Sequence, residues 1–205
     1  MERKEAISKL SKIVDMELHD LASKYGVTFR ASNGQVNKGW AGHTIERFLG
    51  LPLNSSQSPN FGSWELKVVP IRKLLSGQWA IKETMAITMI DPYNVLQTKF
   101  EDSHLFNKLQ KIVMVVRTVG QDMTSDSFVK EIATIDLRDK AVFNQVKADY
   151  ETVRRMLKEF PDGFLRLSGR MGVYIQPRTK GAGHGSVSRA FYARKNFLSI
   201  FIKSI

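Results

Sequence analysis

Residues 58–70 read Ser58-Pro59-Asn60-Phe61-Gly62-Ser63-Trp64-Glu65-Leu66-Lys67-Val68-Val69-Pro70 and carry more structural information than any other part of the chain. The part from Trp64 to Ile71 predicts a β-strand. Side chains alternate between the two faces of a strand, so Glu65 and Lys67 share one face. The apolar residues between and after them share the other face and can enter a core.

A carboxylate and an ammonium side by side near a strand end are suited to phosphodiester hydrolysis. A single Glu-x-Lys on a strand is more often a solvated face, and it is Pro59-Asn60 upstream and the basic C-terminal block that favour a nuclease. The carboxylate of Glu65 can bind Mg²⁺, a hard ion that prefers oxygen ligands. Lys67 can orient an attacking water or stabilise the charge that develops on the phosphate. A second acidic group a few residues upstream normally completes such a metal site, and here that position holds the amide of Asn60.

Composition indicates an ordinary soluble globular chain. The 205 residues suffice for one domain with a real core, with 42% hydrophobic and 25% charged residues. Cysteine is absent, which excludes disulfides, a thiol nucleophile and zinc–thiolate sites and suits a reducing cytoplasm. Neither a signal peptide nor an apolar run of bilayer length is evident.

The positive charge is concentrated at one end of the sequence. The net charge is +11, and the segment 163–205 contains eight Lys or Arg residues and no Asp or Glu. Aromatic residues such as Tyr174 and Tyr192 lie among these cations. A one-sided basic block with interleaved aromatics favours a polyanionic partner, nucleic acid first.

The apolar pattern predicts a mixed α/β fold in a single domain, residues 1–205. We expect a central mixed β-sheet flanked by helices. Trp64–Ile71 and Thr84–Ile90 are expected to pair as a hairpin or meander, and Lys111–Thr118 to be the central strand. Helices are predicted at 3–24, 40–49, up to Lys108 after a cap at Asp102 or Ser103, 139–160 and 196–203. Short strands are predicted at 172–177 and 190–192, on either side of a glycine-rich loop at 179–188.

Three further features bear on chemistry. Glu46 lies in Lys38-Gly39-Trp40-Ala41-Gly42-His43-Thr44-Ile45-Glu46-Arg47-Phe48-Leu49-Gly50. Lys108 lies just before the expected central strand. A basic loop, 176–186, precedes the run Arg189-Ala190-Phe191-Tyr192-Ala193-Arg194-Lys195. Its glycines fit an approach of backbone N–H groups to DNA phosphates better than a nucleotide-binding P-loop.

The chain resembles the MutH family of Mg²⁺-dependent DNA endonucleases, within the PD-(D/E)xK superfamily. That family contains the mismatch-repair nicking enzyme and related type II restriction enzymes. Three blocks carry the resemblance, in order: 38–50, 60–71 and 189–197. They are similar to the family's Lys-Gly-Trp…Glu…Leu-Gly helix, its Asp…Glu-Leu-Lys…Pro strand and its Arg-x-Phe-Tyr-x-x-Lys-Asn-Phe segment.

The resemblance implies a restriction-endonuclease-like fold and a role for each matching residue. Asn60 stands where the family has its first metal-binding Asp, Glu65 matches the second metal ligand, and Lys67 matches the catalytic lysine. Glu46 and Lys108 match residues that support the site. The segments that contain Arg178, Lys180 and Tyr192 match those that the family uses to grip DNA and read bases. From the basic block and the glycine-rich loop we further expect DNA contacts at Arg166, Gly181, Gly183, Arg189, Arg194 and Lys195.

Asn60 is the main departure from the family pattern. An amide can coordinate a metal through its carbonyl but brings no negative charge, so weak Mg²⁺ binding and a large loss of rate are expected. Two origins stay open at this point: an Asp→Asn substitution that traps an uncut complex, or a natural asparagine with another acid serving. The spacing from Asn60 to Glu65 is also shorter than in the mismatch-repair enzyme.

These features together predict a sequence-specific endonuclease of double-stranded DNA that uses Mg²⁺. Because no distinct segment for docking a repair partner is evident, a type II restriction enzyme is favoured over a mismatch-repair nicking enzyme. A non-catalytic DNA-binding protein that keeps the nuclease fold is the competing class. We expect a cytoplasmic protein with no membrane partner, acting as a monomer or homodimer. A GATC target is implied only by the family.

Overall fold

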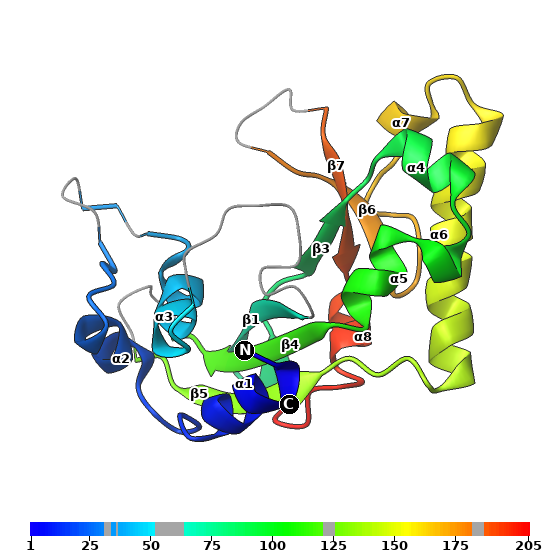
Figure 1. Ribbon diagram of the computed structural model, residues 1–205. Coiled ribbons are helices and arrows are strands. Elements are labelled where there is room, and N and C mark those ends of the chain that lie inside the picture. The colour runs from blue at the N-terminus through cyan, green and yellow to red at the C-terminus, as the bar shows by residue number, and fades with distance from the viewer. Residues whose placement is uncertain (31–33, 36, 52–63, 121–125, 182–186) are drawn as a thin grey trace. The chain divides into compact units, whose positions relative to one another are not determined.

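The computed structural model describes residues 1–205 apart from 31–33, 36, 52–63, 121–125 and 182–186 (Figure 1). Asn60 and Gly183 therefore lie outside the described residues. The chain forms two compact units. The first contains residues 1–82, 112–134 and 202–205, and the second contains residues 83–111 and 135–201. The expectation of a single domain stays a prediction.

The first unit is a mixed four-stranded sheet with helices packed on it. Its strand order is β2-β1-β4-β5. Strands β1 and β4 are parallel, with Glu65 opposite Ile112 and Ile71 opposite Thr118. Strands β2 and β5 add antiparallel edges. The elements are α1 (Arg3–Ser11), α2 (Leu18–Lys24), α3 (Trp40–Phe48), β1 (Glu65–Lys73), β2 (Trp79–Ile81), β4 (Ile112–Thr118) and β5 (Val129–Thr134).

The prediction of a central strand at Lys111–Thr118 is confirmed by β4. Five of its residues, from Ile112 to Val116, are buried, as expected for a strand with neighbours on both sides. Trp40 and Trp64 are also buried. The mixed α/β class and the central mixed sheet are thus confirmed.

The predicted helix 3–24 is instead two helices. The chain leaves α1 after Ser11, and Asp15 adopts a left-handed backbone conformation with φ 63°. The reason is a competing pairing with the sheet: Asp15 N–H donates to the Val129 carbonyl at 2.7 Å, and Leu18 N–H donates to the Ser127 carbonyl at 2.7 Å. The side chain of Glu17 then caps α2 through Asp20 N–H.

The second unit is a three-stranded antiparallel sheet, with order β3-β7-β6, packed against helices. Its longest helix, α6, lies beside β6 and α4 and appears in yellow in Figure 1. Phe100, Phe143, Tyr150 and Phe191 form a connected aromatic core. The elements are β3 (Met85–Met89), α4 (Pro92–Gln97), the 3₁₀ turn η1 (Phe100–Asp102), α5 (His104–Leu109), α6 (Lys140–Glu159), α7 (Gly163–Arg166), β6 (Ile175–Thr179), β7 (Arg189–Ala193) and α8 (Lys195–Leu198).

The predicted pairing of Trp64–Ile71 with Thr84–Ile90 is wrong. After β1 the chain turns at Gly77, whose φ of +86° permits a tight bend. Strand β1 therefore pairs with the short strand β2. Strand β3 pairs with β7 in the other sheet. Strand β2 was not predicted, because Trp79–Ile81 is too short to show a period, and neither was β5.

The other predictions in the second unit are close to what is observed. Ser103 caps α5 by accepting Phe106 N–H at 3.1 Å, and Asp139 caps α6. The closing helix is shorter than predicted, ending at Leu198.

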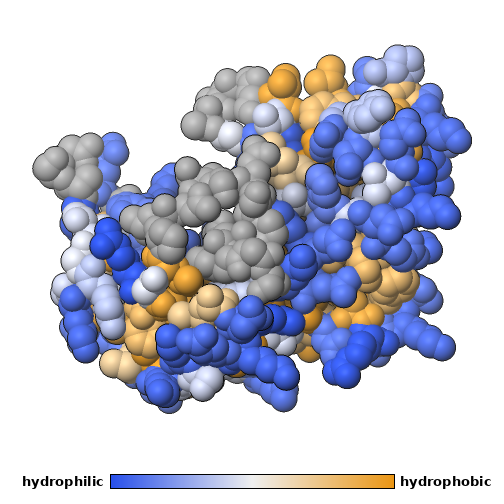
Figure 2. All heavy atoms as spheres, viewed as in Figure 1, coloured by the Kyte–Doolittle hydropathy of each residue, from blue (hydrophilic) through white to orange (hydrophobic). Residues whose placement is uncertain are grey.

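Hydrophilic side chains cover most of the visible side of α6 (Figure 2). None of the helices within the described residues is both long and apolar enough to cross a membrane.

Candidate active site and DNA-binding surface

The face of β1 that carries Glu65 and Lys67 is unusual because a charged pair lies among apolar neighbours. Glu65 is in register with Ile112 and Lys67 with Met114 on β4. The Glu65 carboxylate and the Lys67 ammonium form an ion pair, with side-chain exposures of only 6% and 24%. Charges in such surroundings interact more strongly than in water. The predicted proximity of these two residues is therefore observed.

The local sequence fixes this strand in place. Trp64 is fully buried, and its indole N–H donates to the Met1 carbonyl at 3.0 Å. Leu66 and the partly buried Val68 join the cluster of Trp40, Ile45 and Val113 on the opposite face. Apolar packing on that face orients Glu65 and Lys67 to the other one.

Glu46 lies on α3, which contacts β1. Its carboxyl is half-buried, and this burial raises its pKa above the ordinary value, while nearby His43 opposes part of the rise. The structure therefore places Glu46 on an element adjacent to the Glu65–Lys67 strand, and gives His43 as its electrostatic neighbour.

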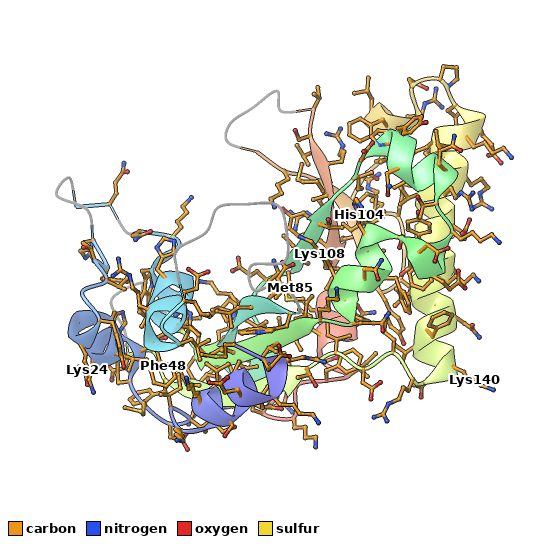
Figure 3. The ribbon with its side chains drawn as sticks, viewed as in Figure 1. Lys24, Phe48, Met85, His104, Lys108 and Lys140 are labelled. Carbon is orange, nitrogen blue, oxygen red and sulfur yellow. The ribbon has the colours of Figure 1, made fainter. Side chains whose placement is uncertain are left out.

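Lys108 lies in the second unit, near the end of α5 and one turn after His104 (Figure 3). It is half-buried, whereas His104 is exposed. Within the described residues no group of three or more His, Cys, Asp or Glu side chains gathers as a metal cluster. Glu65 is thus the predicted metal ligand that the structure describes, since Asn60 is outside it.

The predicted DNA-binding residues that the structure describes are all in the second unit, where they form two groups. Arg178 and Tyr192 come together on one face of the small sheet: the Arg178 guanidinium carbon lies 5.5 Å from the centre of the Tyr192 ring. Lys180, Gly181 and Lys195 are exposed. Lys195 lines a pocket of about 510 Å³ with Thr84, Gln176, Arg194 and Asn196.

The remaining predicted arginines make contacts inside the unit. Arg166 pairs with Asp162 at 2.7 Å. Arg189 donates to the carbonyls of Val187 and Leu167. Arg194 donates to the carbonyl of Gly169 at 2.6 Å. These arginines therefore have structural contacts of their own, beside which a DNA contact stays a prediction.

Sequence reasoning missed Asp149, a buried carboxylate that organises the start of β6. It accepts the backbone N–H groups of Val173, Tyr174 and Ile175 at 2.7–2.8 Å and the Gln145 amide at 2.9 Å. Gly172 next to it has φ +75°, and a Cβ there would lie 1.8 Å from the Ile175 carbonyl oxygen. The signal for Asp149 was an acid on the same helical face as Val146 and Val153.

Comparisons with known proteins agree with this arrangement. The family model described as DNA mismatch repair enzyme MutH matches residues 49–149, which include β1 and the Glu65–Lys67 pair. A DNA mismatch repair protein MutH of Vibrio campbellii is 30% identical over 189 residues, covering 91% of this chain and 80% of the relative. The chain belongs to the MutH family. Proteins of the same description from Shewanella woodyi and Vibrio parahaemolyticus are each 25% identical, covering 91% of this chain and 78% and 80% of those relatives.

Membership of the MutH family confirms the resemblance found in the three sequence blocks. The mixed sheet flanked by helices is the restriction-endonuclease-like fold expected for that family. The chain is a MutH-like DNA endonuclease, and nucleases of this kind depend on a metal ion.

Proposed function

We propose that this chain is a sequence-specific, Mg²⁺-dependent endonuclease that nicks double-stranded DNA, as a mismatch-repair-type enzyme does. The Glu65–Lys67 ion pair, with its carboxylate buried, carries the proposal. The chain covers about four fifths of relatives that are named DNA mismatch repair proteins. Their name supports nicking over the restriction activity that the sequence favoured.

The donor chemistry of the site fits a hard cation in part. Glu65 supplies a carboxylate in a nearly dry environment, where attraction to a divalent cation is strong. We infer that the amide oxygen of Asn60 is the second protein ligand. When bound, Mg²⁺ would activate water and offset charge on the leaving oxygen.

The protein groups have complementary tasks. Lys67, whose ammonium is held by Glu65, would orient the attacking water by donating to its oxygen and would stabilise the phosphate charge. To take the proton of the water, it would first have to be the neutral amine. Glu46 and Lys108 would support the site by proton transfer or charge. Asn60 in place of an acid lowers the negative charge at the metal, so we expect slow cleavage by the chain as it stands.

DNA binding would fall to the basic face of the second unit. Arg178, assisted by Lys180 and Tyr192, would contact base edges in the major groove, where a basic side chain can bond two guanine acceptors. Lys195 and the other predicted cations, Arg166, Arg189 and Arg194, would approach phosphates. Gly181 and Gly183 would let the backbone come close to the DNA. Because the substrate is DNA, we propose a cytoplasmic site of action, as a monomer or homodimer.

Plasmid cleavage in Mg²⁺ tests the proposal, with this chain and its Asn60→Asp variant side by side. Conversion of supercoiled DNA to nicked circles at discrete sites by the Asp variant supports it. Direct conversion to linear DNA would favour the type II restriction enzyme instead. Failure of both proteins on plasmids of different methylation states would favour the non-catalytic DNA-binding protein. Titration of Mg²⁺ into the DNA complex by calorimetry then separates lost metal binding from lost chemistry.

A further inference from the structure

The side chain of Arg178 spans all three strands of the small sheet. Arg178 belongs to β6, at one edge, while β7 is the middle strand and β3 the other edge. The guanidinium lies over the ring of Tyr192 in β7, at 5.5 Å, and Nη1 donates to the hydroxyl of Thr84 beside β3, at 2.9 Å. The guanidinium of this exposed arginine is therefore held by contacts with Tyr192 and Thr84, and not only by the backbone of β6.

Small residues lie along the path of this arm. Ala86 is directly opposite Tyr192 in the β3–β7 pairing, and Ala190 is directly opposite Arg178 in the β6–β7 pairing. Residues in register share a face of a sheet, so Ala86 and Ala190 lie on the face that carries Tyr192 and Arg178. Their methyl groups leave room for the long side chain, while the opposite face carries buried Met85 and Phe191.

Fixing an arginine costs rotamer entropy, and a group that is already fixed in the free protein loses less of it when DNA binds. The Thr84 hydroxyl takes one N–H of Nη1 and leaves the other guanidinium N–H groups free to donate. The hydroxyl therefore restricts the Arg178 side chain and still leaves two parallel guanidinium donors for the two acceptors of guanine.

We propose that Thr84 is a positioning residue that holds Arg178 across Tyr192 so that its remaining donors read the major-groove edge of one guanine. Thr84 thereby sets which base pair is read. This inference rests on the proposed function, because it takes Arg178 to be a base-reading residue. It adds a specificity determinant outside the three sequence blocks that resemble the family.

The test measures base preference and not total affinity. The target is first obtained by enrichment from duplexes with a randomised central segment, with metal omitted so that nothing is cut. Dissociation constants are then measured for the selected duplex and for all single-base variants. The proteins compared are the parent, Thr84→Val, Thr84→Ser, Arg178→Ala and the double variant Thr84→Val/Arg178→Ala.

Thr84→Val keeps the branched shape but removes the hydroxyl, so discrimination is expected to fall roughly three- to tenfold at one guanine position only. Thr84→Ser keeps a hydroxyl and should restore the discrimination at that position. A role of Thr84 in packing alone would not predict a recovery of base preference. Arg178→Ala should lower discrimination at the same position by roughly 5- to 150-fold. In that background Thr84→Val should have no further effect. Thr88→Val, in β3 itself, is the matched control, and thermal unfolding checks that each variant folds.

The outcomes separate the inference from the function on which it rests. If Arg178→Ala relaxes one position and Thr84→Val leaves the profile of the parent, the positioning role is wrong and the function stands. An equal loss at every position with Thr84→Val also overturns the positioning role. If Arg178→Ala leaves all preferences intact, or if no duplex is enriched, the base-reading assignment itself fails and the inference fails with it.

Discussion

Glu65 and Lys67 form an ion pair on one face of β1, with the carboxylate almost completely buried beside Ile112 and Met114. Two residues of separation on a strand are what bring these groups to the same face. A pair held in apolar surroundings is preorganised for a charged substrate, and the cost of its burial is offset by strand packing on the opposite face.

Lys67→Met should abolish most cleavage while leaving DNA binding nearly intact. We expect a loss of roughly 100- to 1,000-fold in the single-turnover rate, because the variant removes the cation that faces the reacting phosphate. Rates are measured in the Asn60→Asp background if the parent is too slow. Lys73→Met, at the exposed end of the same strand, is the control. A rate near that of the parent for Lys67→Met would remove Lys67 from the reaction.

Glu46→Gln should stabilise the protein at neutral pH. Burial raises the pKa of the Glu46 carboxyl above its ordinary value of 4.5, so the folded state holds this proton to higher pH than the unfolded state. Stability from that group is therefore present below pH 4.5 and is lost as pH rises through the folded pKa. The melting temperature of Glu46→Gln should exceed that of the parent at pH 7, and the gap should close at acid pH. A gap that widens toward acid pH would contradict this environment for Glu46.

Asp149→Asn should destabilise the protein by roughly 2–4 kcal/mol, because an amide donor would then face backbone N–H groups in a buried site. Urea unfolding measures this change. Asp136→Asn is the matched control, since Asp136 pairs with the exposed Arg138, and its effect should be under about 1 kcal/mol. Equal effects of the two substitutions would show that the contacts of Asp149 with residues 173–175 contribute little.

Arg178→Ala and Lys195→Ala should differ in kind. The first should cost roughly 1–3 kcal/mol on the preferred duplex and relax its preference. The second should weaken binding to all duplexes and reduce the slope of log affinity against log salt by about one. Fluorescence titrations at several salt concentrations measure both quantities. A uniform loss with Arg178→Ala, or a base-specific loss with Lys195→Ala, would reverse the two assignments.

Short-range patterns predicted the two parallel strands of the first unit, β1 and β4. Alternation around Glu65 and Lys67 gave their shared face, and the apolar run before Thr118 gave the central strand β4. The break after Ser11 escaped prediction because its cause is a pairing of residues 15–18 with the sheet, far along the chain. The partner of β3 escaped for the same reason, since β7 begins about a hundred residues later at Arg189.

The site was predictable where chemistry lies in adjacent residues and not where it arises from contacts across strands. The Glu65–Lys67 pair can be recognised from its spacing in the sequence. Thr84 carries no signal of its own, because its meaning depends on Arg178, which reaches it from another strand. The cationic residues of 163–205 likewise predicted a polyanionic partner. They did not predict that Arg189 and Arg194 donate to backbone carbonyls within their own unit.

The parallel register of β1 and β4 has a consequence for how this chain can change its length. A residue inserted between Trp64 and Glu65 would exchange the faces of the part of β1 that follows it, sending Leu66 and Val68 to the ion-pair face and the Glu65 carboxylate into the apolar cluster. Substitutions within this strand can be graded in effect, whereas insertions and deletions cannot. Insertions and deletions among homologues should therefore be absent from Trp64 to the end of β1, and should occur again at the turn that contains Gly77.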